Sequence, residues 1–98
     1  MFYISEVCVD IKIVTKPWAK ENSWVFGTCQ SSKIYSNRKT YIENCCLIPG
    51  MHTLTCKDSF GDGWHGGYLE IQGKRYCQNF KHGEQKTIKF TVKKEQRS

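Results

Sequence analysis

The segment Val7-Cys8-Val9-Asp10-Ile11-Lys12-Ile13-Val14 places an apolar side chain at every odd position. A period of two puts alternate side chains on the same face of a β-strand, so this pattern predicts a strand with one buried face. The chain ends in the same way: in residues 88–93, IKFTVK, apolar side chains alternate with lysine and threonine. We therefore expect a first and a last strand that each bury one face, the last one showing its lysines to solvent.

Five further segments between these two are rich in aromatic, β-branched or cysteine residues and are separated by turn signals. They are Ser23 to Cys29, Thr40 to Leu47, His52 to Lys57, Tyr68 to Gln72 and Arg75 to Phe80. No window shows the apolar spacing of three and four that a helix requires. About seven short strands at close turn spacing predict an all-β fold, a small disulfide-stapled antiparallel β-sandwich or jelly roll. We expect residues 1–98 to form one such extracellular module.

One turn has a specific signature. Pro49-Gly50 fits the central pair of a type II turn, in which proline presets the first φ and glycine accepts the positive second φ. Because such a turn is short, we expect residues 42–47 and 52–58 to be neighbours.

Six cysteines in 98 residues indicate disulfide bonds made in an oxidising compartment. A domain of this size buries too little apolar surface for more than marginal stability, so covalent cross-links are expected. Zinc is the alternative, but there is no C-x-x-C pair, and His52, His65 and His82 are not spaced as in zinc fingers.

Cys56 and Cys77 flank the glycine-rich segment and the strand that follows it, so they could face each other from nearby strands. Cys45 and Cys46 cannot easily bridge each other, and as neighbours on a strand they point to opposite sides, one toward the core and one toward the surface. The preferred set of disulfides is Cys56–Cys77, Cys29–Cys45 and Cys8–Cys46.

The cysteines favour a secreted, extracellular protein. The opening residues 1–6 lack the basic start, apolar stretch and cleavage site of a signal peptide, so we expect this chain to be a mature or excised fragment. No apolar run is long enough to span a bilayer, and membrane insertion is not expected.

The net charge of +6 comes entirely from the last quarter of the chain. Residues 1–73 contain seven basic and seven acidic side chains, whereas residues 74–98 contain eight and two. Such a segment can attract an anionic polysaccharide or another polyanion, or it can be a solvated strand face. No nucleic-acid motif accompanies the charge, so nucleic acid is not expected as a partner. Residues 94–98 have no apolar anchor and are expected to be a disordered tail.

Residues 58–67, DSFGDGWHGG, combine four glycines with two carboxylates, a tryptophan and a histidine. Glycine at this density indicates a shaped loop whose carbonyls and side chains converge. Asp58 and Asp62, with loop carbonyls and Glu70, are therefore candidate ligands for Ca²⁺, which prefers oxygen donors. The loop is not an EF-hand, because Leu69 stands where that motif needs a bidentate glutamate. The alternative is that both aspartates accept hydrogen bonds from loop amides.

Aromatic and polar side chains of the same loop predict a sugar-binding surface. Trp64, His65, Tyr68 and Asp62 are the candidate ligand-binding residues, because an aromatic face can stack on a sugar ring while polar groups bind its hydroxyls. The alternative places Trp64 beneath the loop, since large aromatic residues are mostly buried. Trp18 follows a proline in a connection and is expected to be partly exposed.

Residues 46–71 resemble the "PG-x-Y-T-L…D-S-Y-G-D-G-W-N-G-G" module of secreted and cell-surface proteins. The resemblance implies an extracellular accessory domain and no particular activity. A fainter likeness is to CUB domains, extracellular jelly rolls with two cysteine pairs and, in many members, a calcium-dependent ligand site. This likeness rests on cysteine spacing, because twenty residues lie between Cys8 and Cys29 and twenty lie between Cys56 and Cys77. It implies a Cys8–Cys29 disulfide, in conflict with the preferred set.

These features predict an extracellular ligand-binding or adhesion module, lectin-like and calcium-dependent, with carbohydrate as the first candidate ligand. One alternative is a structural domain of a secreted or matrix protein that makes protein–protein contacts. Another is a binder of anionic glycans through the basic C-terminal strand. Catalysis is not expected, because the cysteines are used in disulfides and no nucleophile and base are paired.

Overall fold

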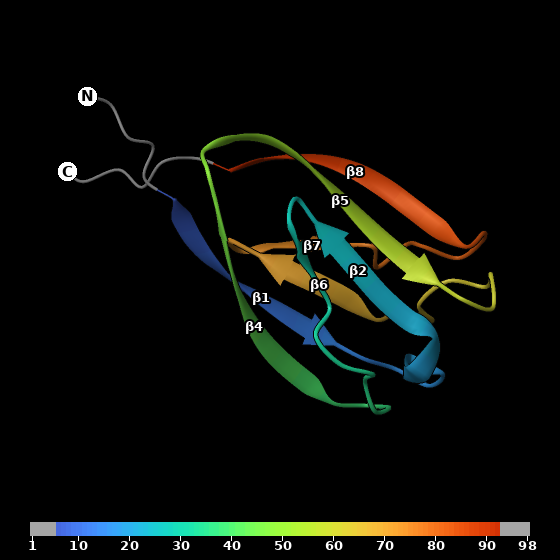
Figure 1. Ribbon diagram of the computed structural model, residues 1–98. Coiled ribbons are helices and arrows are strands. Elements are labelled where there is room, and N and C mark those ends of the chain that lie inside the picture. The colour runs from blue at the N-terminus through green and yellow to red at the C-terminus, as the bar shows by residue number, and fades with distance from the viewer. Residues whose placement is uncertain (1–5, 93–98) are drawn as a thin grey trace, which may run out of the picture.

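Two antiparallel four-stranded sheets pack face to face in the computed structural model, which describes residues 6–92 (Figure 1). The first sheet contains, in spatial order, β4 (Thr40–Leu47), β1 (Val7–Val14), β6 (Tyr68–Ile71) and β7 (Lys74–Tyr76). The second contains β3 (Cys29–Gln30), β2 (Asn22–Phe26), β5 (Gly50–Asp58) and β8 (Gln85–Val92). A single 3₁₀ turn in the described part, η1 (Ala19–Glu21), precedes β2. The predicted all-β sandwich is confirmed.

The core is formed by the inward-facing residues of both sheets. β1 buries Val9, Ile11 and Ile13, as its alternation predicts. From the second sheet, Trp24 and Leu54 are buried against them in the same cluster. The buried faces therefore follow the period of two along each strand.

All six cysteines form disulfides, and the pairs are the predicted ones. They are Cys8–Cys46, Cys29–Cys45 and Cys56–Cys77. Cys45 is buried, and its disulfide with Cys29 links the first sheet to the second. Cys46 is only half-buried, and its disulfide with Cys8 links β4 to β1 within the first sheet. The Cys8–Cys29 pair implied by the likeness to CUB domains does not form.

The connection at Pro49-Gly50 differs from the prediction. β4 and β5 do not pair with each other: β4 pairs with β1 in the first sheet, and β5 pairs with β2 and β8 in the second. Gly50 already belongs to β5, opposite Val92. Proline 49 has no N–H with which to extend a ladder, so the chain crosses from one sheet to the other here. The prediction that residues 42–47 and 52–58 are neighbouring strands was wrong.

Two predicted strands are also shorter than expected. The segment predicted from Ser23 to Cys29 is interrupted at Gly27, which has a φ of 59°, and it becomes β2 and β3. The strand predicted from Arg75 to Phe80 ends at Tyr76, because Cys77 has a φ of 67° that a strand does not allow. The described residues therefore contain eight strands. The tail predicted at residues 94–98 lies outside them.

The glycine-rich loop between β5 and β6 is held against the segment that leads into β8. The Trp64 amide donates to the carbonyl of Phe80 at 3.1 Å, and the Gly83 amide donates to the carbonyl of Gly61 at 2.9 Å. Gly63 has a φ of 85°, and a Cβ at this position would overlap the carbonyl of Phe80. The close approach of these two backbone segments therefore requires glycine at position 63.

This contact predicts unequal effects for two alanine substitutions. Gly66 has a φ of 91° with open space around its absent Cβ, so Gly66→Ala should cost only the backbone strain, about 1–2 kcal/mol. Gly63→Ala adds a steric overlap with backbone and should lower the free energy of unfolding by about 3–4 kcal/mol. Urea denaturation of both variants measures the difference, and equal losses would contradict the contact.

Candidate functional site

Three carboxylates from separate segments meet at one end of the sandwich. Glu21 ends η1, Asp58 ends β5, and Asp62 lies in the glycine-rich loop. One oxygen atom of each lies within 4.8 Å of the others. In Figure 1 this is the right-hand end, where the blue helical turn, the tip of β5 and the yellow loop lie together. We call these residues the carboxylate cluster.

Backbone pairing brings the cluster together. β2 and β5 are antiparallel neighbours, and their ladder ends with Asn22 opposite Asp58. Just beyond the ladder, the Ser59 amide donates to the carbonyl of Glu21 at 3.0 Å. The start of one strand and the end of the other are thereby fixed side by side, which places Glu21 next to the loop.

Asp58 is the structural centre of the cluster. Asp58 is only 1% exposed. Its Oδ1 accepts a hydrogen bond from the Phe60 amide at 3.1 Å, and its Oδ2 accepts one from the Asp62 amide at 2.7 Å. Burial would raise the pKa of Asp58, but hydrogen bonds with the Asp62 side chain and with the amides of Phe60, Asp62 and Gly63 outweigh it and lower the pKa. The carboxylate is therefore ionised and closes the loop, so the alternative of amide acceptance is confirmed for Asp58. It is not confirmed for Asp62, whose Oδ1 has no partner among the described residues and whose Oδ2 lies beside His65.

Several polar atoms around the cluster are buried without a hydrogen-bond partner among the described residues. They are Glu21 Oε1, Asp62 Oδ1 and both polar side-chain atoms of Asn22. Asn22 is 3% exposed, and because it stands opposite Asp58 in the ladder, both side chains project from the same face of the sheet. Such an orphaned group destabilises the fold unless something satisfies it. A cation that binds several oxygens at once would satisfy the three oxygens, but not the amide nitrogen of Asn22, which is a donor.

The charges indicate which ligand fits. Burial, and then the negative charges of Asp58 and Asp62, raise the pKa of Glu21. Carboxylate and amide oxygens are the hard donors that Ca²⁺ binds, six to eight at a time, and a divalent cation would remove the repulsion between the carboxylates. The donor set of Glu21, Asn22, Asp58 and Asp62 therefore fits calcium.

The sequence identified only part of this donor set. Asp58 and Asp62 were predicted, whereas Glu21 and Asn22 lie in a distant segment without a motif of their own. Glu70, also a predicted ligand, is not in the cluster: its Oε1 is 3.7 Å from Arg75 Nε, on the outer face of the first sheet. The alternation along β6 turns Glu70 outward because Leu69 is buried.

The predicted ligand-binding residues separate in the structure. Trp64 is 0% exposed, and its indole Nε1 donates to the carbonyl of Lys57 at 2.8 Å. The assignment of Trp64 to the ligand surface was wrong, because its large apolar ring is buried beneath the loop. His65 stays at the cluster, with Nε2 3.2 Å from Asp62 Oδ2.

Tyr68 lies elsewhere. It projects from the outer face of β6, where the guanidinium of Arg75 stacks 4.3 Å from the centre of its ring. The carboxylate cluster belongs to the inner face of the second sheet, so the structure does not bring Tyr68 to it. The sequence also gave no signal that Phe60 would be exposed, whereas the partial exposure of Trp18 was predicted and is confirmed.

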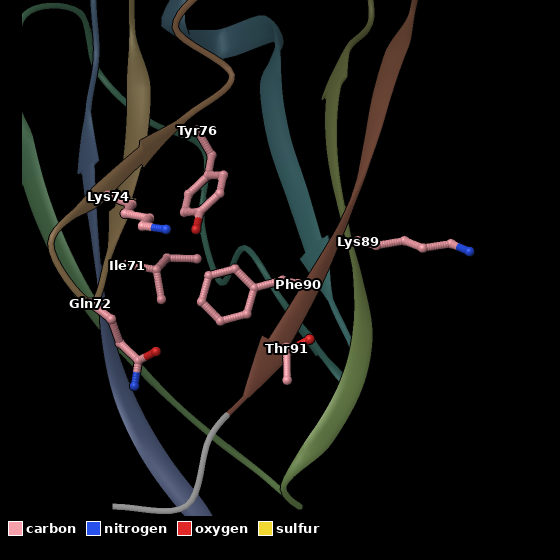
Figure 2. Close-up of a pocket in the computed structure, with 7 residues that line it drawn as sticks. All are labelled: Ile71, Gln72, Lys74, Tyr76, Lys89, Phe90 and Thr91. Atoms are coloured by element: carbon pink, nitrogen blue, oxygen red, sulfur yellow. The ribbon is translucent and has the colours of Figure 1, made fainter.

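A separate hollow of about 370 Å³ opens between β7 and β8 (Figure 2). It is lined by Ile71, Gln72, Lys74, Tyr76, Lys89, Phe90 and Thr91. Figure 2 shows the rings of Tyr76 and Phe90 turned toward each other, the ammonium of Lys74 pointing toward the hollow and that of Lys89 pointing away from it. A neighbouring hollow is lined by Arg75, Cys77, Gln78, Asn79 and Lys81. The two linings together contain four cationic side chains and no carboxylate.

No family model matches the chain, and neither the curated proteins nor the solved structures give a significant match. The resemblance to the glycine-rich secreted module and the fainter one to CUB domains therefore stay predictions. Among residues 6–92 no helix is long and apolar enough to cross a membrane.

The raised pKa of Glu21 predicts how the metal-free protein responds to pH. The folded state holds the Glu21 proton more tightly than the unfolded state, so its stability falls as the pH rises from the ordinary value of 4.5 through the raised pKa. In a chelating buffer at neutral pH, Glu21→Gln should raise the melting temperature. The gain should disappear at a pH below 4.5.

Asp10→Asn is the matched control, because this exposed carboxylate lies on the outer face of β1 and its Oδ1 already accepts from Asn44. It should leave the melting temperature nearly unchanged at both pH values. A Glu21→Gln variant that melts below the wild type in chelator would contradict repulsion within the cluster.

Proposed function

We propose that this chain is an extracellular module that binds carbohydrate in a calcium-dependent manner, through residues 58–68 and the adjoining turn η1. The observation that carries the proposal is the carboxylate cluster with its buried, unpartnered oxygens. The three disulfides indicate an extracellular or otherwise oxidising environment, and they support secretion.

Each residue of the cluster has a distinct part in this proposal. Asp58 holds the loop closed through the Phe60 and Asp62 amides, so the loop keeps its shape before any ion binds. Glu21, Asn22 and Asp62 contribute the oxygens that lack partners. Bound calcium would offset two of the three carboxylate charges and offer its remaining coordination positions to hydroxyl groups. His65 lies beside Asp62 at the edge of the site and can donate a hydrogen bond to a ligand.

Calcium binding tests the first half of the proposal. Calorimetric titration should show one Ca²⁺ bound by the wild-type protein, with a Kd on the order of 10⁻⁴–10⁻³ M or tighter, as in extracellular modules. Asp62→Asn removes a charged ligand but keeps the size of the side chain, and it should weaken binding at least about tenfold, the equivalent of roughly 1.4 kcal/mol. Asp10→Asn should bind calcium like the wild type. An absence of calcium binding would remove the metal from the proposal.

A glycan array, read with calcium and then with chelator, tests the second half. Retention in calcium and its loss in chelator are expected. A protein that binds calcium and gains thermal stability, yet retains no glycan and captures only protein neighbours, would instead be a structural domain of a secreted protein.

The basic hollows between β7 and β8 favour a second candidate function, the binding of an anionic polysaccharide. The Lys74 ammonium points toward an aromatic floor formed by Tyr76 and Phe90, and Lys81 lines the second hollow, so a polyanion would meet attraction and a stacking surface. Such binding is independent of calcium and weakens as salt screens the charges.

Two lysines provide the matched test. Lys74→Ala and Lys89→Ala each remove one charge from the same hollow, but only the Lys74 ammonium points toward it (Figure 2). Affinity for heparin, measured by calorimetry at two salt concentrations, should fall more for Lys74→Ala than for Lys89→Ala. Equal losses of heparin affinity in the two variants would mean that only the net charge matters. Unchanged affinity in both variants would exclude the hollow as the heparin-binding site.

A further inference from the structure

Two large apolar side chains that lie close to the carboxylate cluster in the sequence remain in solvent. Trp18 is 61% exposed and lies shortly before Glu21, and Phe60 is 73% exposed and lies between the two aspartates of the cluster. Backbone hydrogen bonds join their segments: the Glu21 amide donates to the carbonyl of Trp18 at 3.1 Å, and the Ser59 amide donates to the carbonyl of Glu21 at 3.0 Å. Both aromatic residues therefore belong to backbone segments that are hydrogen-bonded to each other at the cluster.

Trp18 is held in an unusual conformation. Its φ of 69° and ψ of 28° lie in the left-handed region, which costs a bulky residue about 1–2 kcal/mol and is ordinarily given to glycine or asparagine. The ring gains little from packing, since most of it is exposed. Neither backbone preference nor burial accounts for tryptophan here, whereas contact with a ligand would.

The backbone beside Trp18 is fixed before any ligand arrives. The Ala19 amide donates to Asn37 Oδ1 at 2.9 Å, and Ala19 is fully buried. The following turn is closed by the bond from Glu21 to Trp18. The indole is therefore carried by an ordered segment, which lowers the entropy lost when a ligand stacks on it.

The donors of the cluster are also too few to complete the coordination of a bound Ca²⁺ if each supplies one oxygen. Glu21, Asp58 and Asp62 offer one oxygen each within 4.8 Å, and Asn22 adds an amide oxygen on the same face as Asp58. Calcium takes six to eight oxygens, so these donors do not complete its coordination. The remaining positions require neutral oxygens from water or from a ligand.

We infer that Trp18 and Phe60 are the stacking residues of the site, on which a neutral sugar ring lies while its hydroxyls complete the coordination of calcium. This inference rests on the proposed function and reassigns its aromatic surface from the buried Trp64 to two exposed residues on the backbone segments that carry the cluster. Each aromatic face takes up the apolar C–H face of a sugar, and the ion binds the polar edge.

Charge favours a neutral sugar over an anionic lipid headgroup or an acidic glycan. Three carboxylates and one Ca²⁺ leave one negative charge uncompensated in the cluster. A phosphate or carboxylate placed on the ion would face this charge at short range, whereas a hydroxyl would not. The anionic ligands are instead matched by the hollows between β7 and β8.

Alanine variants of both residues test the inference on an array of neutral oligosaccharides in calcium. Trp18→Ala and Phe60→Ala should each weaken glycan binding by roughly tenfold or more, equivalent to about 1.4 kcal/mol. Calorimetry should show unchanged calcium affinity, because neither residue supplies a ligand oxygen. Ile42→Ala removes a similarly exposed apolar side chain from the outer face of β4 and should bind glycans like the wild type.

Tryptophan fluorescence provides an independent readout. Trp24 and Trp64 are buried, so among the three tryptophans only Trp18 is open to a soluble quencher such as iodide. Adding the array-positive sugar with calcium should protect this emission, and protection should vanish in chelator.

The outcomes separate the inference from the function on which it rests. Wild-type protein that retains no neutral glycan would overturn both. Glycan binding that survives in Trp18→Ala and Phe60→Ala would overturn the inference and leave the function standing. Calcium-dependent capture by phosphatidylserine vesicles, lost in Trp18→Ala, would overturn it in favour of a membrane surface.

Discussion

The buried carboxylate of Asp58 connects the sheet framework of this module to its loop. It is the last residue of β5, and its two oxygens accept the amides of Phe60 and Asp62. These bonds hold the first turn of the loop and set Asp62 beside Glu21. Without an acceptor at this position, the amides of Phe60 and Asp62 would lose their hydrogen-bond partners and the first turn of the loop would lose its support. The carboxylate cluster thus depends on Asp58, whose hydrogen bonds also stabilise the fold of the loop.

The glycine-rich loop is stabilised by a buried side chain, whereas aromatic side chains next to it remain exposed. Trp64 fills the space beneath it and donates to Lys57, so the largest side chain of the loop contributes burial rather than recognition. Trp18 and Phe60 remain in solvent on the neighbouring segments. In this small disulfide-linked sandwich the connections therefore carry the surface for which we propose a binding role, while the buried apolar residues hold the two sheets together.

Much of the framework could be predicted because its signals are local. Alternation along residues 7–14 identifies a buried strand face, and adjacent Cys45 and Cys46 must point to opposite sides of a strand. The crossing at Pro49-Gly50 was misjudged, because a short turn gives no information about which sheet the next strand will join. Among the site residues, Asp58 and Asp62 stood out in a glycine-rich motif, whereas Glu21 had no local pattern to mark it.

The sequence alone determined the strand periodicity, the all-β class and the disulfide-linked character of this chain, since each follows from residue types and short spacings. Only the tertiary structure decided which side chains share a surface. The antiparallel pairing of β2 with β5 sets Asn22 opposite Asp58 and brings Glu21 to the loop. The packing of the loop also decided that Trp64 is buried. Both outcomes depend on contacts between segments that are far apart in the chain, and neither periodicity nor composition encodes those contacts.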